Sequence, residues 1–125
     1  MSRPHYTHKD ANHHILRDFM RTFCGGYEEH KDGRTVAYTA NFRGRKFVAY
    51  DTANIGGVFA DWLLECVSTQ QFMWVEIKTE DTRKQDGDFR AGTFKEGEEW
   101  LRENSSSWIV AVTDEDVKAV FELLL

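Results

Sequence analysis

Two charged residues near the middle of the chain have the types and the spacing of a catalytic site. Glu76 and Lys78 stand two residues apart in FMWVEIKT, a run whose other residues are typical of an apolar strand. Residues two apart in a strand share one face, so both charges project to the same side. Burying ions without partners is costly. We therefore expect this end of the strand to lie at the rim of a sheet or in a cleft.

Asp61 is a third candidate, because a short connection joins its predicted strand to that of Glu76. If the two strands are neighbours, the two carboxylates converge and repel each other. A divalent cation such as Mg²⁺ or Mn²⁺, which prefers oxygen ligands, relieves this repulsion. Lys78 could then hold a phosphate oxygen or orient an attacking water. The set is typical of metal-assisted phosphodiester hydrolysis, although an E-x-K pair also occurs as an exposed ion pair without catalytic role.

Hydrophobic periodicity predicts the elements that must position these residues. The predicted helices are 9–23, 93–104 and 113–125, the last with Thr113 as N-cap. The predicted strands are 34–42, 45–50, 58–67, 72–79 and 107–112, the first two forming a hairpin around Arg43-Gly44. Polar segments at 27–33 and 80–92 are predicted to be loops. This order indicates an α/β fold with a mixed sheet flanked by helices.

Composition places the chain among globular, non-membrane proteins. Its 125 residues suit one domain, 41% are hydrophobic, and no apolar run reaches the roughly 18 residues of a membrane span. The start is not that of a signal peptide, and Cys24 and Cys66 are interpreted as unpaired thiols in a reducing cytoplasm. Residues 1–50 hold nine Lys and Arg against five Asp and Glu, whereas the remainder holds seven against sixteen. A basic front half can face a polyanion, or it can be ordinary surface charge.

Five short motifs occur in the order found in the PD-(D/E)xK nuclease superfamily. They are DANHHI (10–15), DTANIGGVFAD (51–61), VEIK (75–78), EGEEWL (96–101) and VTDEDV (112–117). With these motifs the chain resembles, more closely, small phage and bacterial nucleases of the VRR-NUC type, relatives of Holliday-junction resolvases. The resemblance covers most of the chain as a single domain, 1–125, with 27–50 as a hairpin insertion.

The resemblance implies a restriction-endonuclease-like fold, a mixed central sheet flanked by helices, with an extra β-hairpin. It also implies Mg²⁺ or Mn²⁺ as cofactor and hydrolysis of phosphodiester bonds in duplex or branched DNA. Asp61 and Glu76 would hold the metal, and Ile77 would add its backbone carbonyl. Lys78 would be the catalytic lysine, and Glu98 would take the place of the family's accessory Gln or Glu.

The chain departs from the family pattern at three places. Ala60 replaces a proline, Val58 replaces the third glycine of a GGG turn, and His13-His14 stand where the first helix carries a Gln or Glu. The last difference keeps a second interpretation open. The protein would then be a catalytically inactive relative that binds DNA or inhibits another protein.

Contacts to DNA are assigned to basic and polar side chains outside the carboxylate set. The candidates are Asn12, His13, Arg43, Arg45, Lys46 and Arg83. The three at the hairpin turn could grip phosphates, or could protect an edge strand from aggregation. Arg83 lies among alternating charges, which also suit a solvated loop. The resemblance places the protein in a bacterial cytoplasm, possibly encoded by a phage, and a homodimer would match the two-fold symmetry of a DNA junction.

Overall fold

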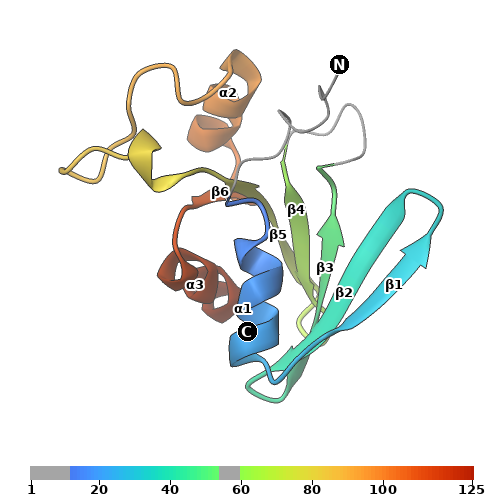
Figure 1. Cartoon of the computed structure of the whole chain (residues 1–125). Helices are drawn as coiled ribbons and strands as arrows, with labels where there is room; N and C mark the ends of the chain where they lie inside the picture. Colours follow the sequence, from blue (N-terminus) through green and yellow to red (C-terminus); the bar gives the residue numbers. More distant parts are fainter. Residues whose placement is uncertain (1–11, 54–59) are drawn as a thin grey trace, which may run out of the picture.

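The computed structural model describes residues 12–53 and 60–125, which form a six-stranded sheet and three α-helices (Figure 1). The strands follow one another across the sheet in chain order. They are β1 (Glu28–Asp32), β2 (Thr35–Phe42), β3 (Arg45–Asp51), β4 (Trp62–Cys66), β5 (Gln71–Ile77) and β6 (Trp108–Ala111). The helices are α1 (Ile15–Phe23), α2 (Glu96–Asn104) and α3 (Asp114–Leu124), with a short 3-10 helix at Glu80–Thr82.

The sheet is mixed, as the order of predicted elements indicated. Strands β1 to β5 pair antiparallel with their neighbours, whereas β5 and β6 are parallel. A parallel pair needs a long crossover connection, and the chain between β5 and β6, which contains α2, supplies it. The α/β class with a mixed sheet and helices is therefore confirmed.

The segment 27–33 is not a loop, and that prediction was wrong. It contains β1, whose register pairs Asp32 with Thr35 across a two-residue turn. Gly33 has φ of 62°, which a glycine adopts without strain in such a hairpin turn. All five side chains of β1 are exposed, so no apolar alternation reveals the strand in the sequence. The available signal was a glycine at the first position of the two-residue turn, Gly33-Arg34.

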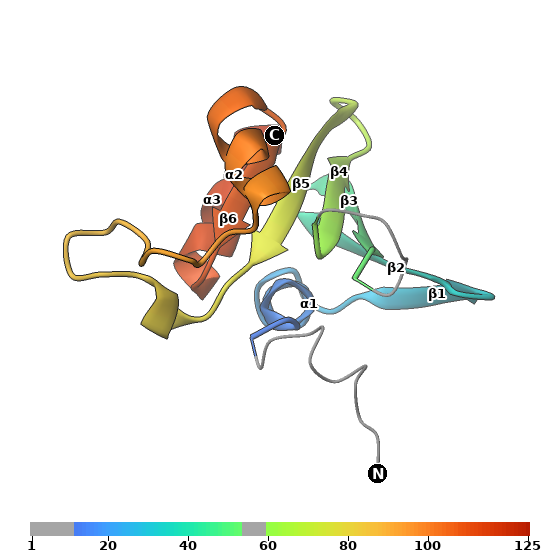
Figure 2. The same cartoon turned by 90° about the horizontal axis from the view of Figure 1, so that it is seen from above.

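The core lies between the sheet and two helices. Helices α1 and α3 lie side by side on one face of the sheet, and α2 contacts β6 instead (Figures 1 and 2). The ring of Phe121 of α3 contacts those of Phe19 and Phe47 in tilted arrangements, with centroid distances of 4.9 and 4.8 Å. These three side chains are almost fully buried and come from α1, β3 and α3, so they join the first half of the chain to the last.

Two sequence expectations about side chains have different outcomes. Cys24 and Cys66 are unpaired, as expected. The four tryptophans stand in predicted strands and helices at positions that indicate packing in the core. Trp62 and Trp108 are buried and Trp74 is half-buried, but the prediction is wrong for Trp100, whose exposed fraction is 62%. Within the described part of the chain, no helix combines the length and the apolar character needed to cross a bilayer.

Candidate active site

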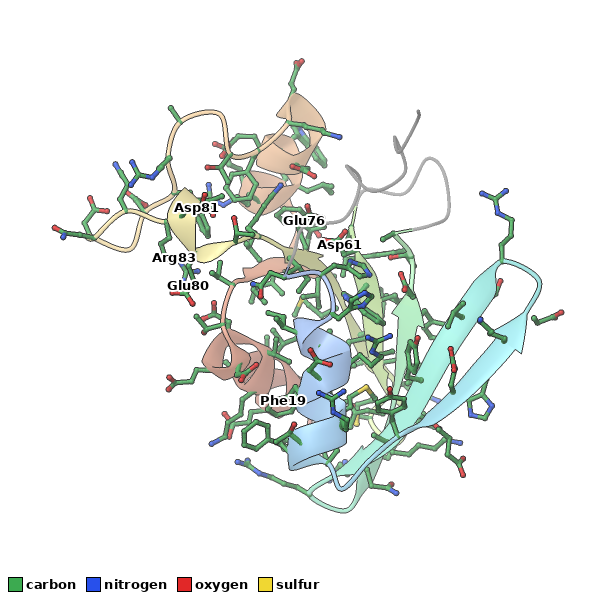
Figure 3. All side chains as sticks on the ribbon, in the orientation of Figure 1. Phe19, Asp61, Glu76, Glu80, Asp81 and Arg83 are labelled. Atoms are coloured by element: carbon green, nitrogen blue, oxygen red, sulfur yellow. The ribbon has the colours of Figure 1, made fainter. Side chains whose placement is uncertain are left out.

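The sheet register brings Asp61 and Glu76 together at one end of the sheet. Trp62 pairs with Val75, so Asp61 immediately precedes β4 at the level of Glu76. Figure 3 shows both side chains close together near the N-terminal end of α1. The backbone N–H of Ile77 donates a 2.8 Å hydrogen bond to Oδ2 of Asp61. The convergence of the two carboxylates, expected from the order of the strands, is therefore present.

The chain around Asp61 is held by Thr52, which follows β3. The N–H of Thr52 donates to the carbonyl of Asp61 at 2.9 Å, and its hydroxyl donates to the carbonyl of Ala60 at 2.8 Å. Thr52 is buried, so these bonds are shielded from water. Gly56-Gly57 and Val58, which form the glycine turn of the motif before Asp61, lie outside the described residues.

Lys78 lies between two carboxylates from different elements. Its Nζ is 3.2 Å from Oε2 of Glu76 and 3.4 Å from Oε1 of Glu98. Glu98 is itself oriented, because the same Oε1 accepts a 3.1 Å hydrogen bond from the N–H of Lys95 at the start of α2. Lys78 is thus held by Glu76 from the end of β5 and by Glu98 from helix α2.

The pKa of Glu76 is raised from 4.5 to about 8, chiefly because burial disfavours its charged form. Repulsion from Asp61 and Glu98 adds to this, and Lys78 opposes it. Burial alone would lower the pKa of Lys78, but Glu76 and Glu98 outweigh burial and raise it. The site thus places more carboxylate charge around Glu76 than its one lysine neutralises.

This donor set suits a hard divalent cation. Asp61 and Glu76 offer carboxylate oxygens, the donors that Mg²⁺ and Mn²⁺ prefer. The N–H of Ile77 faces Asp61, whereas the N–H of Lys78 donates to β6, at the carbonyl of Ala111. Since the N–H and C=O of one strand residue point the same way, the Ile77 carbonyl also faces the Asp61 side.

The side chains alone do not complete such a site. Among residues 12–53 and 60–125, no group of three or more His, Cys, Asp or Glu is arranged to hold a metal ion. The remaining ligands of a cation here would be main-chain carbonyls and water, which Mg²⁺ commonly retains.

A buried histidine adjoins the carboxylates. His13 precedes α1 and is 1% exposed, with Nδ1 3.8 Å from Oδ1 of Asp61 and Nε2 3.5 Å from Oδ1 of Asp51. Its ring stacks on Trp62 with a centroid distance of 5.3 Å. Burial would lower the pKa of His13, but the two aspartates raise it. Asp51, at the end of β3, is 6% exposed. The sequence motif that contains Asp51 did not predict a function for it.

Asn12 has a main-chain role. Its amide donates to the carbonyl of Lys78 at 3.0 Å and to that of Val112 at 2.6 Å. These carbonyls follow β5 and β6, so Asn12 ties together the ends of the two parallel strands beside the site. Both amide hydrogens of Asn12 are therefore used by the main chain.

The basic residues of the β2–β3 turn do not join the site. Arg43 pairs with Glu122 of α3 at 2.5 Å, and Arg45 donates to Ser68 at 3.2 Å. Arg45 and Asp51 begin and end β3, which separates them by about 20 Å at about 3.3 Å per residue. Arg43, Arg45 and Lys46 thus lie at the opposite end of the sheet from the carboxylates.

The loop after Lys78 is held by aromatic rings stacked against cations. Arg83 and Arg102 lie over the ring of Phe89, at 4.9 and 5.3 Å from its centroid. Arg102 and Lys78 lie over the ring of Phe94, at 4.6 and 5.5 Å. Arg83 also pairs with Asp116 of α3 at 3.3 Å. These interactions fix the loop against α2 and α3, and Figure 3 shows Arg83 farther out than Glu76.

Comparison with family models, with curated proteins and with solved structures found no match to this chain.

Proposed function

We propose that the protein is a metal-dependent DNA endonuclease of the PD-(D/E)xK superfamily, of the VRR-NUC type, with a restriction-endonuclease-like core. One observation carries the proposal. Asp61, Glu76 and Lys78, chosen for their chemistry and spacing, meet at one end of the sheet, where Glu76 is buried and its pKa is raised to about 8. A buried carboxylate cluster with one lysine is costly to fold, so a functional reason for it is favoured.

In this proposal Asp61, Glu76 and the Ile77 carbonyl would hold Mg²⁺ or Mn²⁺. The cation, when bound, would neutralise charge that develops on the scissile phosphate and promote attack by water. Lys78 contributes a fixed positive charge, because its raised pKa keeps the ammonium protonated. It therefore acts as a hydrogen-bond donor to a phosphate oxygen or to the attacking water, and Glu98 holds it in place.

The proposed substrate is DNA, duplex or branched, in a bacterial cytoplasm. A Holliday-junction-resolvase-like enzyme would act as a homodimer, because a four-way junction presents two equivalent strands. A preference for a branched over a linear substrate distinguishes this subclass from a general nicking enzyme.

The test is cleavage of a supercoiled plasmid and of a labelled four-way junction, with Mg²⁺ or Mn²⁺. Wild type is compared with Asp61→Ala, Lys78→Ala and, as a matched control, Lys118→Ala on the exposed side of α3. We expect metal-dependent cutting by wild type and the control, and at least a roughly hundredfold loss in the other two variants, as for removal of one electrostatic group. Cutting that survives both Asp61→Ala and Lys78→Ala contradicts the assignment of the site.

The second candidate is a nuclease-fold protein that binds DNA, or inhibits another protein, without cutting. Two observations favour it: His13-His14 stand where the resemblance places a Gln or Glu, and the described side chains include no group of three or more metal ligands. Binding of DNA by wild type, with no cleavage under either metal, would establish this candidate.

A further inference from the structure

His13 is built into the fold more firmly than a surface contact to DNA requires. Its imidazole is 1% exposed and stacks on Trp62 with an interplanar angle of 20°. Its backbone carbonyl accepts a 3.0 Å hydrogen bond from Nε1 of the same tryptophan. Trp62 directly follows Asp61 and pairs with Asp51 across the β3–β4 ladder. His13 is therefore held by Trp62, the residue that follows the predicted metal ligand Asp61 in the chain.

The two ring nitrogens point to two different carboxylates. Nε2 lies toward Asp51 and Nδ1 toward Asp61, at 3.5 and 3.8 Å, so the imidazole bridges the end of β3 and the start of β4. The other oxygen of Asp61 accepts the N–H of Ile77. One oxygen of Asp61 is therefore held by a main-chain hydrogen bond, and the other faces the imidazole at ion-pair distance, longer than a hydrogen bond.

We infer that Asp51 and His13 form a positioning pair for Asp61, in which Asp51 orients the imidazole on the Trp62 ring and the imidazole orients the Asp61 carboxylate toward Glu76. Neither member is a catalytic residue, since each acts through Asp61. The inference rests on the proposed function in that it takes Asp61 as a cation ligand. It assigns a role to the one buried aspartate of the described residues, which the catalytic set leaves unused.

The pair makes a directional prediction about substitutions of His13. An asparagine places its amide near the position of Nδ1, toward Asp61, whereas a glutamine places its amide near that of Nε2, toward Asp51. His13→Asn should therefore retain more of the function than His13→Gln. Asp51→Asn removes the charge that orients the imidazole, and Asp18→Asn on the exposed part of α1 is its matched control.

The first measurement is Mn²⁺ binding, followed by the electron paramagnetic resonance signal of free Mn²⁺. We expect dissociation constants roughly 10- to 100-fold higher for Asp51→Asn and His13→Gln, a smaller rise for His13→Asn, and none for Asp18→Asn. The second measurement is plasmid cleavage, where kcat should fall in the same order while KM for DNA is unchanged. Thermal unfolding identifies any variant that has lost its fold. The inference is then judged on the variants that remain folded.

The outcomes separate this inference from the proposed function. Wild type that binds Mn²⁺ but cuts no DNA overturns the nuclease and leaves the pair to be judged by Mn²⁺ binding alone. The positioning role of the pair is overturned if folded Asp51→Asn binds Mn²⁺ as tightly as wild type. It is also overturned if His13→Asn and His13→Gln bind Mn²⁺ equally well. Either result counts even if wild type cuts DNA. Wild type that binds no Mn²⁺ overturns both.

Discussion

Glu76 illustrates how a residue can have opposite effects on folding and on function. Its carboxyl is buried, and its pKa is raised to about 8 by burial and by neighbouring carboxylates. The metal-free protein therefore holds a proton on Glu76 that the unfolded chain releases near its ordinary pKa. A buried carboxyl that must take up a proton contributes less to stability than an apolar side chain would. The same carboxyl becomes an anionic ligand when a cation binds and displaces the proton.

The free energy of unfolding of the metal-free protein should fall as pH rises between about 4.5 and about 8. Because the pKa of Glu76 is higher in the folded than in the unfolded state, the folded protein binds more protons in this range. The contribution of this proton to stability is fully present below the unfolded-state pKa. It is lost as pH rises to the folded-state pKa. The change should be on the order of a few kcal/mol, measured by urea denaturation with a chelator. Glu76→Gln should flatten this dependence, and an equal slope in wild type and variant would contradict the assignment.

Phe94 should influence catalysis through Lys78, whose Nζ lies 5.5 Å from its ring centroid. Phe94→Leu keeps an apolar side chain but removes the ring, and a cation–π interaction contributes about 0.5–1 kcal/mol. We expect kcat for plasmid cleavage to fall about two- to fivefold.

Phe89→Leu is the control for Phe94, because the ring of Phe89 lies against Arg83 and Arg102. Equal losses in both variants would indicate that the loop, and not the interaction with the lysine, is responsible.

At the scale of elements, helix α3 depends on its first turn. The hydroxyl of Thr113 accepts the N–H of Asp116 at 3.2 Å, and the carboxylate of Asp116 accepts the N–H groups of Val112 and Thr113 at 2.8 and 3.2 Å. This reciprocal cap satisfies donors that a helix start leaves unpaired. Thr113 is the N-cap that the sequence predicted.

Removing this cap should destabilise the protein without altering the site. Thr113→Ala should lower the free energy of unfolding by about 1 kcal/mol, because the Asp116 N–H loses its acceptor. Thr113→Ser, which keeps the hydroxyl, should remain close to wild type. Urea denaturation compares the three, and a loss of the same size in Thr113→Ser would show that the methyl group, and not the cap, is responsible.

The sequence predicts elements well where apolar residues recur at the spacing of a helix or of a strand. Helices α1 and α3 and strands β2 to β6 lie within or close to their predicted ranges for this reason. Strand β1 was missed because its residues are all exposed, and only backbone pairing makes it a strand. The meeting of Asp61, Glu76 and Lys78 was predictable from alternation and strand order. Asp51 was not, because its part in the site depends on a histidine distant in sequence.

At the scale of the whole molecule, the predicted DNA-binding residues divide between two ends of the sheet. Lys78 and its carboxylate partners lie at one end, and Arg45 and Lys46 begin β3 at the other. A ligand that touches both ends must span about 20 Å along the sheet. A DNA duplex has that extent, whereas a single phosphate group reaches one end only.

The distal basic residues should therefore affect binding but not the chemical step. Arg45→Gln with Lys46→Gln should raise KM for DNA and leave kcat unchanged. The dependence of log affinity on log salt concentration should become shallower by about one for each phosphate that the variant no longer neutralises. Arg21→Gln on exposed α1 is the control for charge alone. A fall in kcat for the double variant would contradict this separation.

The exposed strand β1 has a consequence for how the protein behaves at high concentration. It lies on the outer edge of the sheet, opposite the loop after Lys78 (Figure 2), and among residues 12–53 and 60–125 its backbone has a partner strand on one side only. Such an edge invites another chain to add a strand, and charged side chains are a common protection against this. Glu28, Glu29, Lys31 and Asp32 occupy four of its five positions. The same charged residues that leave β1 without apolar alternation are thus of the kind that disfavours strand addition at a sheet edge.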